Sequence, residues 1–366
     1  MYDFLIVGAG ITGITAASVL ARELNKKVLI VEKRSHIGGN CYDYYNEYGI
    51  LIHKYGPHIF HTQYKEVWDY LSQFTEWLPY VHKVLAWVDG KYISFPVNIK
   101  TLEQLFDKSF TEKEMRDWIE TQRLPIENPQ NAEQVVVSKM GYFLYEKLFK
   151  YYTKKQWGIE AKELGSEVTA RIPIRFNRDD RYFTDPYQGM PKEGYSKMFQ
   201  KMLNLKNIEI VLNTDYKQVI NDIKFNKLIY TGSIDYFFDY QFGPLPYRSL
   251  KFVFKTLNKK WFQPVGVVNY PNNYKFTRIA EFKHLTGQEY FKTTICYEYP
   301  QDYVPDKNIP CYPIPKKETQ EIYEKYKNAA QKLKTVYFVG RLAEYKYFNM
   351  DMCVKKGMEI GRNCAR

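Results

Sequence analysis

Apolar runs of strand length and one stretch with helical spacing alternate through the first forty residues. Residues 2–7 and 27–32 are short runs with apolar centres, which is typical of parallel strands buried on both faces. Between them, residues 14–24 place apolar side chains at helical spacing. The pattern predicts a strand–helix–strand unit whose two strands are parallel.

Glycines fill the turn between the first strand and the helix. Gly8, Gly10 and Gly13 form a G-x-G-x-x-G pattern, and Glu32 ends the second strand about 20 residues later. The first glycine permits a tight turn, the second lets backbone approach a pyrophosphate, and the third lets the helix sit close to the strand. The helix N-terminus favours the anion, and Glu32 can accept both ribose hydroxyls. We therefore expect a dinucleotide site; the alternative is a βαβ unit that binds nothing.

A second glycine pair bears on which dinucleotide is bound. Gly38 and Gly39 follow Lys33 and Arg34 closely, and backbone without side chains can surround the far side of a long dinucleotide. The run from Glu32 to this pair resembles the FAD-binding signature of the glutathione-reductase-like flavoproteins. The resemblance implies permanently bound FAD, with a nicotinamide cofactor only as a visitor.

Beyond residue 40 the apolar spacing changes several times, which predicts more than one domain. The expected helices span residues 64–74, several segments of 99–164, and 349–362, where Asn349 is a good N-cap residue. The expected strands span residues 84–88, 92–95, 209–212, 227–232, several segments of 237–315, and 335–341. Asp89-Gly90 between two of these strands is a hairpin signal.

The 366 residues exceed the size of one ordinary core. We expect an α/β fold in which a Rossmann-like, glutathione-reductase-like FAD-binding domain carries an inserted helical domain and an antiparallel β-sheet domain. The FAD-binding domain comprises residues 1–78, 191–236 and 316–366, and the helical domain residues 99–166. The sheet domain, which binds substrate, comprises residues 79–98, 167–190 and 237–315.

The composition is that of an ordinary globular protein, with 45% hydrophobic and 26% charged residues. The net charge of +12 suits a pyrophosphate-bearing substrate, or reflects only a lysine-rich surface. We find no nucleic-acid-binding motif. Five scattered cysteines without a C-x-x-C pair fit a reducing cytoplasm. With no signal peptide and no apolar run of ~20 residues, we expect a cytoplasmic protein without a membrane span; a homodimer is left open.

Two polar segments are candidates for site chemistry. His53, His58 and His61 fall within nine residues, but no carboxylate or cysteine lies at ligand spacing. We expect no metal there and favour a loop beside a cofactor ring. Residues 169–183 are rich in arginine and lack periodicity, which suits a lid over phosphates or an ordinary exposed loop. The aromatic stripe of residues 142–157 is more often helix core than a ligand-binding surface.

Longer strings of the sequence resemble one family, the UDP-galactopyranose mutases, over the whole chain. The strings are residues 32–34, 36–40, 53–56, 58–62, 152–158, 171–173, 182–183, 187–189, 247–252, 277–279 and 340–347. The resemblance implies an isomerase that interconverts the pyranose and furanose forms of a nucleotide sugar, of the UDP-galactopyranose to UDP-galactofuranose type, for cell-surface polysaccharide. It implies that N5 of reduced FAD attacks the anomeric carbon and displaces the nucleotide diphosphate, and that NAD(P)H or another reductant only charges the flavin.

The resemblance also implies roles for residues at matching positions. Arg171 and Arg278 would hold the pyrophosphate and His58 would lie near flavin N5, and these three form the catalytic set. The substrate-binding set is Phe149, Tyr152, Thr153, Trp157, Tyr182, Phe183, Asn269, Tyr312, Tyr347 and His82. The cofactor-binding set is Gly8, Gly10, Gly13, Glu32, Lys33, Arg34, Gly39, Asn40, His58, Ile59, Arg341, Asn349 and Met350.

Five positions depart from the family pattern and leave the sugar and the nucleotide open. They are His82, which replaces an asparagine, Tyr151, Cys311, Phe282 and Asn349. Neutral drift explains these departures as well as a changed substrate does. The alternative substrates are nucleotide sugars that carry N-acetylgalactosamine or a heptose, and dTDP-fucose. A buried polar group left unpaired can reject a substrate strongly.

Two other classes of protein share this fold signature. One is a flavin amine-oxidase-like oxidoreductase, which fold alone does not exclude. The other is a protein that binds FAD or a nucleotide sugar without catalysis. The paired arginines argue against an amine oxidase, because an amine substrate has no pyrophosphate to bind.

Overall fold

The computed structural model describes residues 1–364, which group into two compact units. Unit 1 contains Met1–Tyr80, Asp185–Leu245 and the chain from Glu321 onward, and unit 2 contains Val81–Thr184 and Pro246–Gln320. Each unit is therefore assembled from separated parts of the chain.

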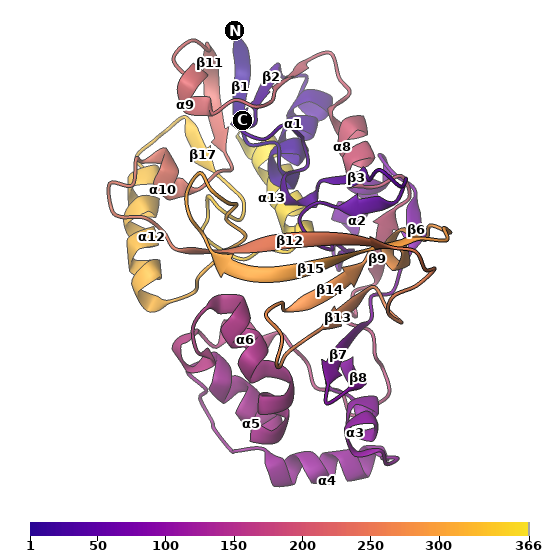
Figure 1. Cartoon of the computed structure of the whole chain (residues 1–366). Coiled ribbons are helices and arrows are strands. Elements are labelled where there is room, and N and C mark those ends of the chain that lie inside the picture. The colour runs from indigo at the N-terminus through magenta and orange to yellow at the C-terminus, as the bar shows by residue number, and fades with distance from the viewer. Residues whose placement is uncertain (365–366) are drawn as a thin grey trace. The chain divides into compact units, whose positions relative to one another are not determined.

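Unit 1 is organised on a parallel sheet of five strands in the order β10-β2-β1-β11-β17. These strands are β1 (Tyr2–Val7), β2 (Val28–Val31), β10 (Ile208–Val211), β11 (Phe225–Tyr230) and β17 (Val336–Phe338). The first strand lies in the middle, so the order reverses beside it, and ligands of such sheets bind beyond the carboxyl ends of the strands at that point. Figure 1 shows β1, β2 and β11 together beside the first helix.

The other elements of unit 1 are mostly short. Its helices are α1 (Ile11–Leu24), η1 (Gly39–Cys41), α2 (Lys65–Ser72), α8 (Tyr195–Leu203), α9 (Tyr216–Val219), α10 (Ile234–Phe237), α12 (Lys317–Ala330), which begins in unit 2, and α13 (Met350–Asn363). Its remaining strands are β3 (Asp43–Tyr45), β4 (Leu51–His53), β5 (Phe60–Thr62), β6 (Trp77–Pro79) and β9 (Tyr187–Pro191).

The apolar runs of the sequence form the core of this sheet, as predicted. Leu5, Val7, Leu29 and Val31 belong to one buried cluster with residues of β11. Helix α1 begins at Ile11, three residues before the predicted start at residue 14, because Gly10 already takes the N-cap position in an extended conformation.

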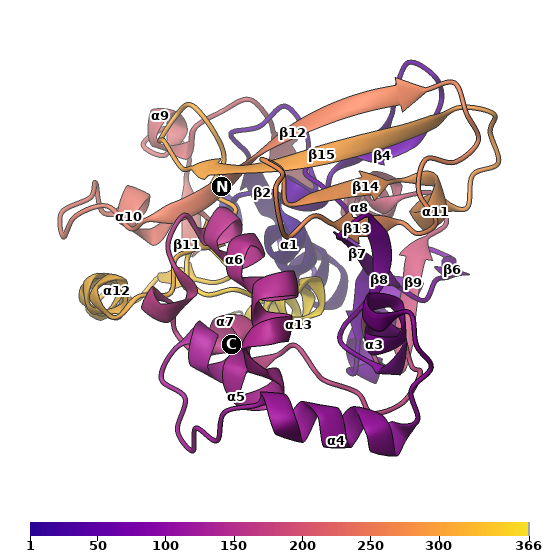
Figure 2. The same ribbon diagram turned by 60° about the horizontal axis from the view of Figure 1, so that its bottom comes forward.

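Unit 2 contains a sheet of seven strands in the order β16-β12-β15-β14-β13-β7-β8. These strands are β7 (Val84–Val88), β8 (Lys91–Phe95), β12 (Tyr247–Leu257), β13 (Val267–Asn269), β14 (Arg278–Glu281), β15 (Thr293–Asp302) and β16 (Tyr312–Pro313). All neighbours are antiparallel except β7 and β13, which are parallel. Figure 2 shows β12, β15 and β14 side by side.

Helices occupy the middle of the unit 2 sequence. They are α3 (Ile99–Phe106), α4 (Glu112–Gln122), α5 (Ala132–Leu144), η2 (Tyr145–Phe149), α6 (Lys150–Trp157), η3 (Ala161–Glu163), α7 (Glu167–Ala170) and α11 (Lys283–Thr286). The predicted hairpin is confirmed, since Asp89 and Gly90 both have the positive φ that a type I′ turn requires.

The units differ from the predicted domain boundaries in several places. The helical segment and the sheet segments fall in the same unit, because α6 packs on β15 and α3 on β8. Residues 185–190 belong to unit 1 rather than to the sheet domain, because β9 pairs with β5 and β6. Residues 79–80 and 237–245 also belong to unit 1, whereas residues 316–320 belong to unit 2. Among the helices of residues 1–364, none is long and apolar enough to cross a lipid bilayer.

Candidate active site

In the glycine turn after β1, Gly8 and Gly13 are tightly packed, whereas Gly10 is not. A Cβ on Gly8, whose φ is +102°, would lie 2.2 Å from Thr231 Oγ1, and a Cβ on Gly13 would lie 2.1 Å from the Gly8 carbonyl oxygen. A Cβ on Gly10 would meet no described atom within 4 Å. The outer two glycines are thus required by packing, whereas Gly10 faces space that a ligand can occupy.

The second glycine pair lies directly against this turn. The Gly38 N–H donates to the Ala9 carbonyl oxygen at 2.8 Å, and a Cβ on Gly39 would lie 2.9 Å from Gly10 Cα. Both glycines have positive φ values. Two segments that are about 30 residues apart in the chain therefore form one backbone surface with no side chain on it.

Glu32 is buried at the end of β2 and oriented by backbone groups. Its Oε2 accepts from the Ala9 N–H at 2.7 Å, and its Oε1 accepts from the Arg34 N–H at 2.8 Å. Each carboxylate oxygen retains a further lone pair. The carboxylate is held in place and can still accept ribose hydroxyls.

Two buried polar atoms beside this surface lack a partner within the described residues. They are Nη1 of Arg34, a donor, and Oδ1 of Asn40, an acceptor. Buried polar groups are normally hydrogen-bonded, so such atoms call for a ligand or water. A donor and an acceptor of this kind fit a dinucleotide with a pyrophosphate and polar ring edges.

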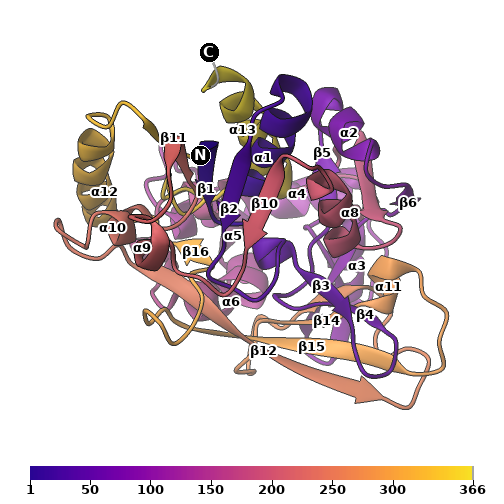
Figure 3. The same ribbon diagram turned by 90° about the horizontal axis from the view of Figure 1, so that it is seen from above.

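Helices α1 and α13 run parallel and in close contact (Figure 3). A Cβ on Gly357 would lie 2.7 Å from the Thr12 carbonyl oxygen, and a Cβ on Gly361 2.9 Å from Val19. Since Gly357 is level with Thr12, α13 begins about 9 Å before α1 along their common direction. Two positive helix ends, separated along one line, suit a long anionic ligand.

The start of α13 differs from the prediction in one detail. Asn349 takes the N-cap position, but its side chain makes no cap hydrogen bond. Nearby, Arg341 Nη2 donates to the Phe348 carbonyl oxygen at 2.6 Å, and its guanidinium carbon lies 4.9 Å from the centre of the exposed Tyr347 ring. Lys33, also predicted to bind cofactor, is exposed, and its Nζ lies 3.4 Å from Asp215.

The histidine segment holds two neutral imidazoles with defined tautomers. Burial lowers the pKa of His53 to about 3, and burial together with the His53 charge lowers the pKa of His58 to about 3. His58 Nδ1 lies 2.9 Å from the Gly56 carbonyl oxygen and so carries the proton, which leaves its Nε2 as an acceptor. His53 Nδ1 accepts from the His58 backbone N–H at 3.0 Å.

No cluster of three or more histidine, cysteine or carboxylate side chains that could hold a metal is present in the described part of the chain. His61 Nδ1 lies 2.7 Å from an oxygen of Asp185. This pairing gives His61 a structural partner instead of a shared ligand set with His53 and His58.

In unit 2, Arg278 is the first residue of β14 and is held by two neighbours. Its Nη2 donates to the Tyr152 hydroxyl at 2.5 Å, and its Nε lies 3.5 Å from an oxygen of Glu298. Glu298 is buried in the strand position opposite Arg278, and burial raises its pKa while the arginine charge opposes that rise. Glu298 was not predicted from the sequence; the available signal was an acid within an apolar and aromatic strand.

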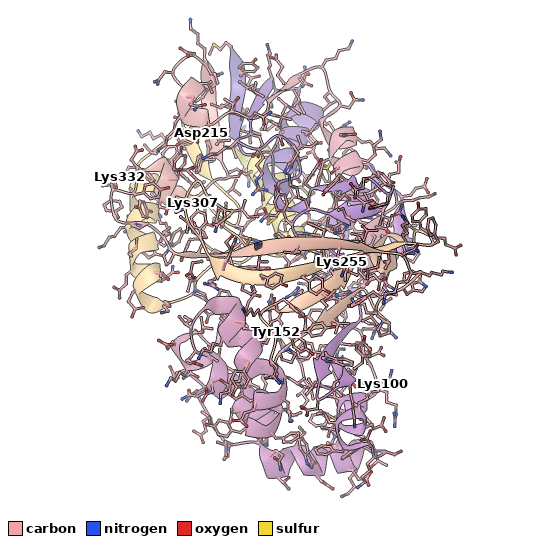
Figure 4. All side chains as sticks on the ribbon, viewed as in Figure 1. Lys100, Tyr152, Asp215, Lys255, Lys307 and Lys332 are labelled. Atoms are coloured by element: carbon pink, nitrogen blue, oxygen red, sulfur yellow. The ribbon has the colours of Figure 1, made fainter. Side chains whose placement is uncertain are left out.

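Helix α6 carries the predicted aromatic residues on different faces. A π-helical turn, η2, precedes it, and Phe149 at their junction is buried. Trp157 lies 6.2 Å from Tyr312, between ring centres. Tyr151 is exposed, so this departure from the family pattern lies on the surface. Figure 4 marks Tyr152 where α6 approaches the sheet.

His82 lies buried in an aromatic cluster. Its ring centre is 5.6 Å from Tyr182 and 5.8 Å from Phe183, and its carbonyl oxygen accepts from the Tyr182 N–H at 2.7 Å. Phe95 contacts both Tyr182 and Phe149. The structure thus brings four of the predicted substrate residues into one cluster through Phe95.

The arginines of residues 169–183 have different hydrogen-bond partners. Arg175 donates to the carbonyl oxygens of Asp179 and Arg181, and Arg181 pairs with the Asp179 carboxylate. Arg178 donates to both oxygens of Glu103 at 2.6 Å. These three arginines stabilise the segment itself. Arg171 is exposed at the C-cap position of α7.

The remaining departures from the family pattern are core positions. Phe282 is fully buried, and its ring lies 6.0 Å from that of Phe254. Cys311 is buried, and its N–H donates to the Arg248 carbonyl oxygen at 2.9 Å. Both side chains pack within unit 2.

The predicted residues thus form two sets. The cofactor set, His58 and Tyr347 belong to unit 1, and the other substrate and catalytic residues belong to unit 2. Asn269 lies opposite Arg278 on the neighbouring strand β13, and Thr153 is buried on α6.

Comparison with known families identifies the chain. A family model described as UDP-galactopyranose mutase matches residues 147–347, more than half of the chain. The chain belongs to the UDP-galactopyranose mutase family. A second model, for an NAD(P)-binding Rossmann-like domain, matches residues 6–74.

Curated relatives of this mutase family align over nearly the whole chain. A dTDP-fucopyranose mutase of Escherichia coli is 37% identical over 99% of this chain and 98% of its own. A probable UDP-galactopyranose mutase of Klebsiella pneumoniae is 38% identical over 98% of this chain and 93% of its own. The chain is therefore equally similar to members named for two different nucleotide sugars.

Solved structures agree with the fold. A crystal structure of reduced UDP-galactopyranose mutase matches with a TM-score of 0.79 at 17% identity, covering 100% of this chain and 96% of the other. A putrescine oxidase variant matches with a TM-score of 0.60 at 14% identity, covering 100% and 99%.

Family membership confirms the predicted family, fold class and enzyme class. The chain is a nucleotide-sugar mutase, an isomerase, and a flavoprotein that binds FAD. The oxidase-like fold neighbours show the shared architecture alone.

Proposed function

We propose that this mutase interconverts the pyranose and furanose forms of a nucleotide-diphosphate sugar, with UDP-galactose as the first candidate and dTDP-fucose as the second. The observation that supports this proposal most directly is the cluster of Arg278, Tyr152 and Glu298. In this cluster the guanidinium of Arg278, on strand β14, is held in place by its two neighbours. The second candidate is included because the E. coli relative, which is 37% identical, is named for that sugar.

We propose that unit 1 binds FAD through the residues predicted from the sequence. Gly10 and Gly39 admit the pyrophosphate, Glu32 accepts ribose hydroxyls, and Arg34 and Asn40 offer their unpaired buried atoms. Lys33, Ile59, Arg341 and Met350 complete this set, with the end of α13 stabilising negative charge. When bound and reduced, FAD supplies a nucleophilic nitrogen for the anomeric carbon.

His58 is proposed to act as a neutral hydrogen-bond acceptor. Its pKa of about 3 keeps the ring uncharged at pH 7, and its Nδ1 proton is committed to Gly56. Its Nε2 can therefore accept a hydrogen bond while the ring stays neutral. A charged imidazole at this place would instead repel the neighbouring cationic groups.

Arg171 and Arg278 are proposed to bind the diphosphate of the substrate, because an arginine fork matches paired phosphate oxygens. The diphosphate must leave and return within one catalytic cycle. Fixed cations stabilise the leaving group in the transition state more than the bound substrate. The tyrosines Tyr182, Tyr312 and Tyr347 are proposed as further donors to the same oxygens.

The nucleotide and the sugar are proposed to contact different substrate-binding residues of unit 2. Phe149, Tyr152 and Thr153 would line the base pocket, and Trp157, Phe183, Asn269 and His82 would contact the sugar. NAD(P)H or another reductant is proposed to reduce the flavin. The enzyme is proposed to be cytoplasmic, and its product to be used in the synthesis of cell-surface polysaccharide.

The test is turnover of defined nucleotide sugars by reduced holoenzyme. Protein reduced with dithionite is incubated separately with UDP-galactofuranose and dTDP-fucofuranose, and the products are separated by HPLC. We expect conversion of at least one substrate by the reduced enzyme and none by the oxidised enzyme. Conversion of neither substrate, with no sugar-bearing flavin after cyanoborohydride trapping, would refute the proposal.

A further inference from the structure

Two consecutive lysines of α6 have different surroundings. Lys154 is exposed, and its Nζ pairs with Glu160 at 2.5 Å. Lys155 is half-buried, and its Nζ lies 2.5 Å, 3.0 Å and 3.1 Å from three backbone carbonyl oxygens. These oxygens belong to Tyr270, Tyr274 and Phe276. One ammonium therefore directs all three of its N–H donors at a single segment.

That segment is the turn between β13 and β14, and it leads into Arg278. The Tyr270 N–H donates to the Thr277 carbonyl oxygen at 2.8 Å, which closes the turn directly before Arg278. Tyr152, which accepts from Arg278, lies one helical turn before Lys155. Positions three apart share a face of a helix. Helix α6 thus contacts the turn through Lys155 and the arginine through Tyr152.

The convergence of the three carbonyls needs a cation or several donors. Carbonyl dipoles that point at one place repel each other, and two of the three contacts are part-buried, where a carbonyl without a partner costs free energy. The rings of Tyr270, Tyr274 and Phe276 lie 4.9–5.2 Å from one another, so the turn is packed by its own side chains. The ammonium is the group that offsets the dipole repulsion.

We propose that Lys155 is a positioning residue: its ammonium gathers the carbonyls of the β13–β14 turn and so fixes the Arg278 guanidinium for binding a nucleotide diphosphate. This inference rests on the proposed function, in which Arg278 binds that group. Burial lowers the pKa of Lys155 to about 8. The ammonium is therefore largely intact at pH 7, and above pH 8 it loses its charge and one donor.

The test compares Lys155→Met with Lys154→Met, which removes the neighbouring exposed amine from the same helix. Binding of UDP and of dTDP to the holoenzyme is measured by titration calorimetry. We expect Lys155→Met to raise the Kd about tenfold or more, as the loss of a charge-assisted contact implies, with FAD content unchanged. Lys154→Met should bind like the wild type, and Lys155→Arg should recover most of the affinity.

A second arm measures diphosphate binding by the wild type across pH and uses two variants for comparison. The wild-type Kd should rise between pH 7 and pH 9, whereas the Kd of Lys155→Arg should stay level, because a guanidinium remains charged. Amide exchange of residues 270–277 should quicken in Lys155→Met alone.

The outcomes separate this inference from the proposed function. Normal wild-type turnover with equal affinities in Lys155→Met and wild type would overturn the role of Lys155 only. A wild-type Kd that is level from pH 7 to pH 9 would do the same. A wild type that binds neither diphosphate and turns over neither sugar would overturn the proposed function as well.

Discussion

The Arg278 guanidinium donates through Nη2 to the hydroxyl of Tyr152, a residue 126 positions away in the chain. Glu298 approaches the same guanidinium at Nε. A guanidinium held by two neighbours loses little conformational freedom when it binds an anion, which is the condition for a preorganised site.

Replacing Arg278 by alanine should lower turnover far more than it lowers stability. We expect kcat/KM to fall by about 10²–10³-fold, the usual effect of removing a transition-state donor, while FAD stays bound. The matched control is Arg178→Ala, because Arg178 pairs with Glu103 on the outside of the same unit. Steady-state kinetics with flavin absorbance checks both variants; an unchanged rate in Arg278→Ala would refute its role.

The glycine turn makes a paired prediction about FAD. Gly10→Ala should fold normally and bind FAD at least about tenfold more weakly, because its Cβ meets no protein atom but enters the space assigned to the pyrophosphate. Gly13→Ala should instead lower Tm, because its Cβ would lie 2.1 Å from the Gly8 carbonyl oxygen. Thermal unfolding and flavin titration separate the two effects. Full FAD affinity in Gly10→Ala would contradict the proposed cofactor position.

Acid should destabilise unit 1 through His53, which is 1% exposed. Its pKa of about 3 lies below the unfolded value of about 6.5, so the unfolded chain binds more protons between these pH values. The free energy of unfolding should therefore fall as the pH drops below 6.5, by about 2 kcal/mol at pH 5 from this group. Urea unfolding of wild type and His53→Gln, with excess FAD at pH 7 and pH 5, measures it. Equal pH dependence in both proteins would exclude His53 as the cause.

His82 is expected to influence which sugar is accepted. In His82→Asn, the ratio of kcat/KM for UDP-galactofuranose to that for dTDP-fucofuranose should rise about tenfold, since the residue packs between Tyr182 and Phe183. His284→Asn makes the same chemical change at a histidine stacked on Trp261, and its ratio should not move. An identical ratio in His82→Asn would assign the exchange to drift.

The local elements could be predicted from the sequence because each is specified by residues that are neighbours in the chain. The strand from residue 2, the helix that follows and the turn at Asp89-Gly90 depend on apolar spacing and on glycine, so they were predicted correctly. The domain boundaries were harder to predict from the sequence, because β9 belongs to unit 1 only through its pairing with the distant strands β5 and β6.

The sequence by itself determined the βαβ unit, the glycine pattern and the family, because these reside in short strings and their spacing. Only the tertiary structure placed Glu298 beside Arg278 and Lys155 against the turn that precedes Arg278, and paired Arg178 with Glu103 and Arg181 with Asp179. The reason is physical: a hydrogen bond or ion pair between distant residues depends on strand register and helix facing, and these are set by long-range packing.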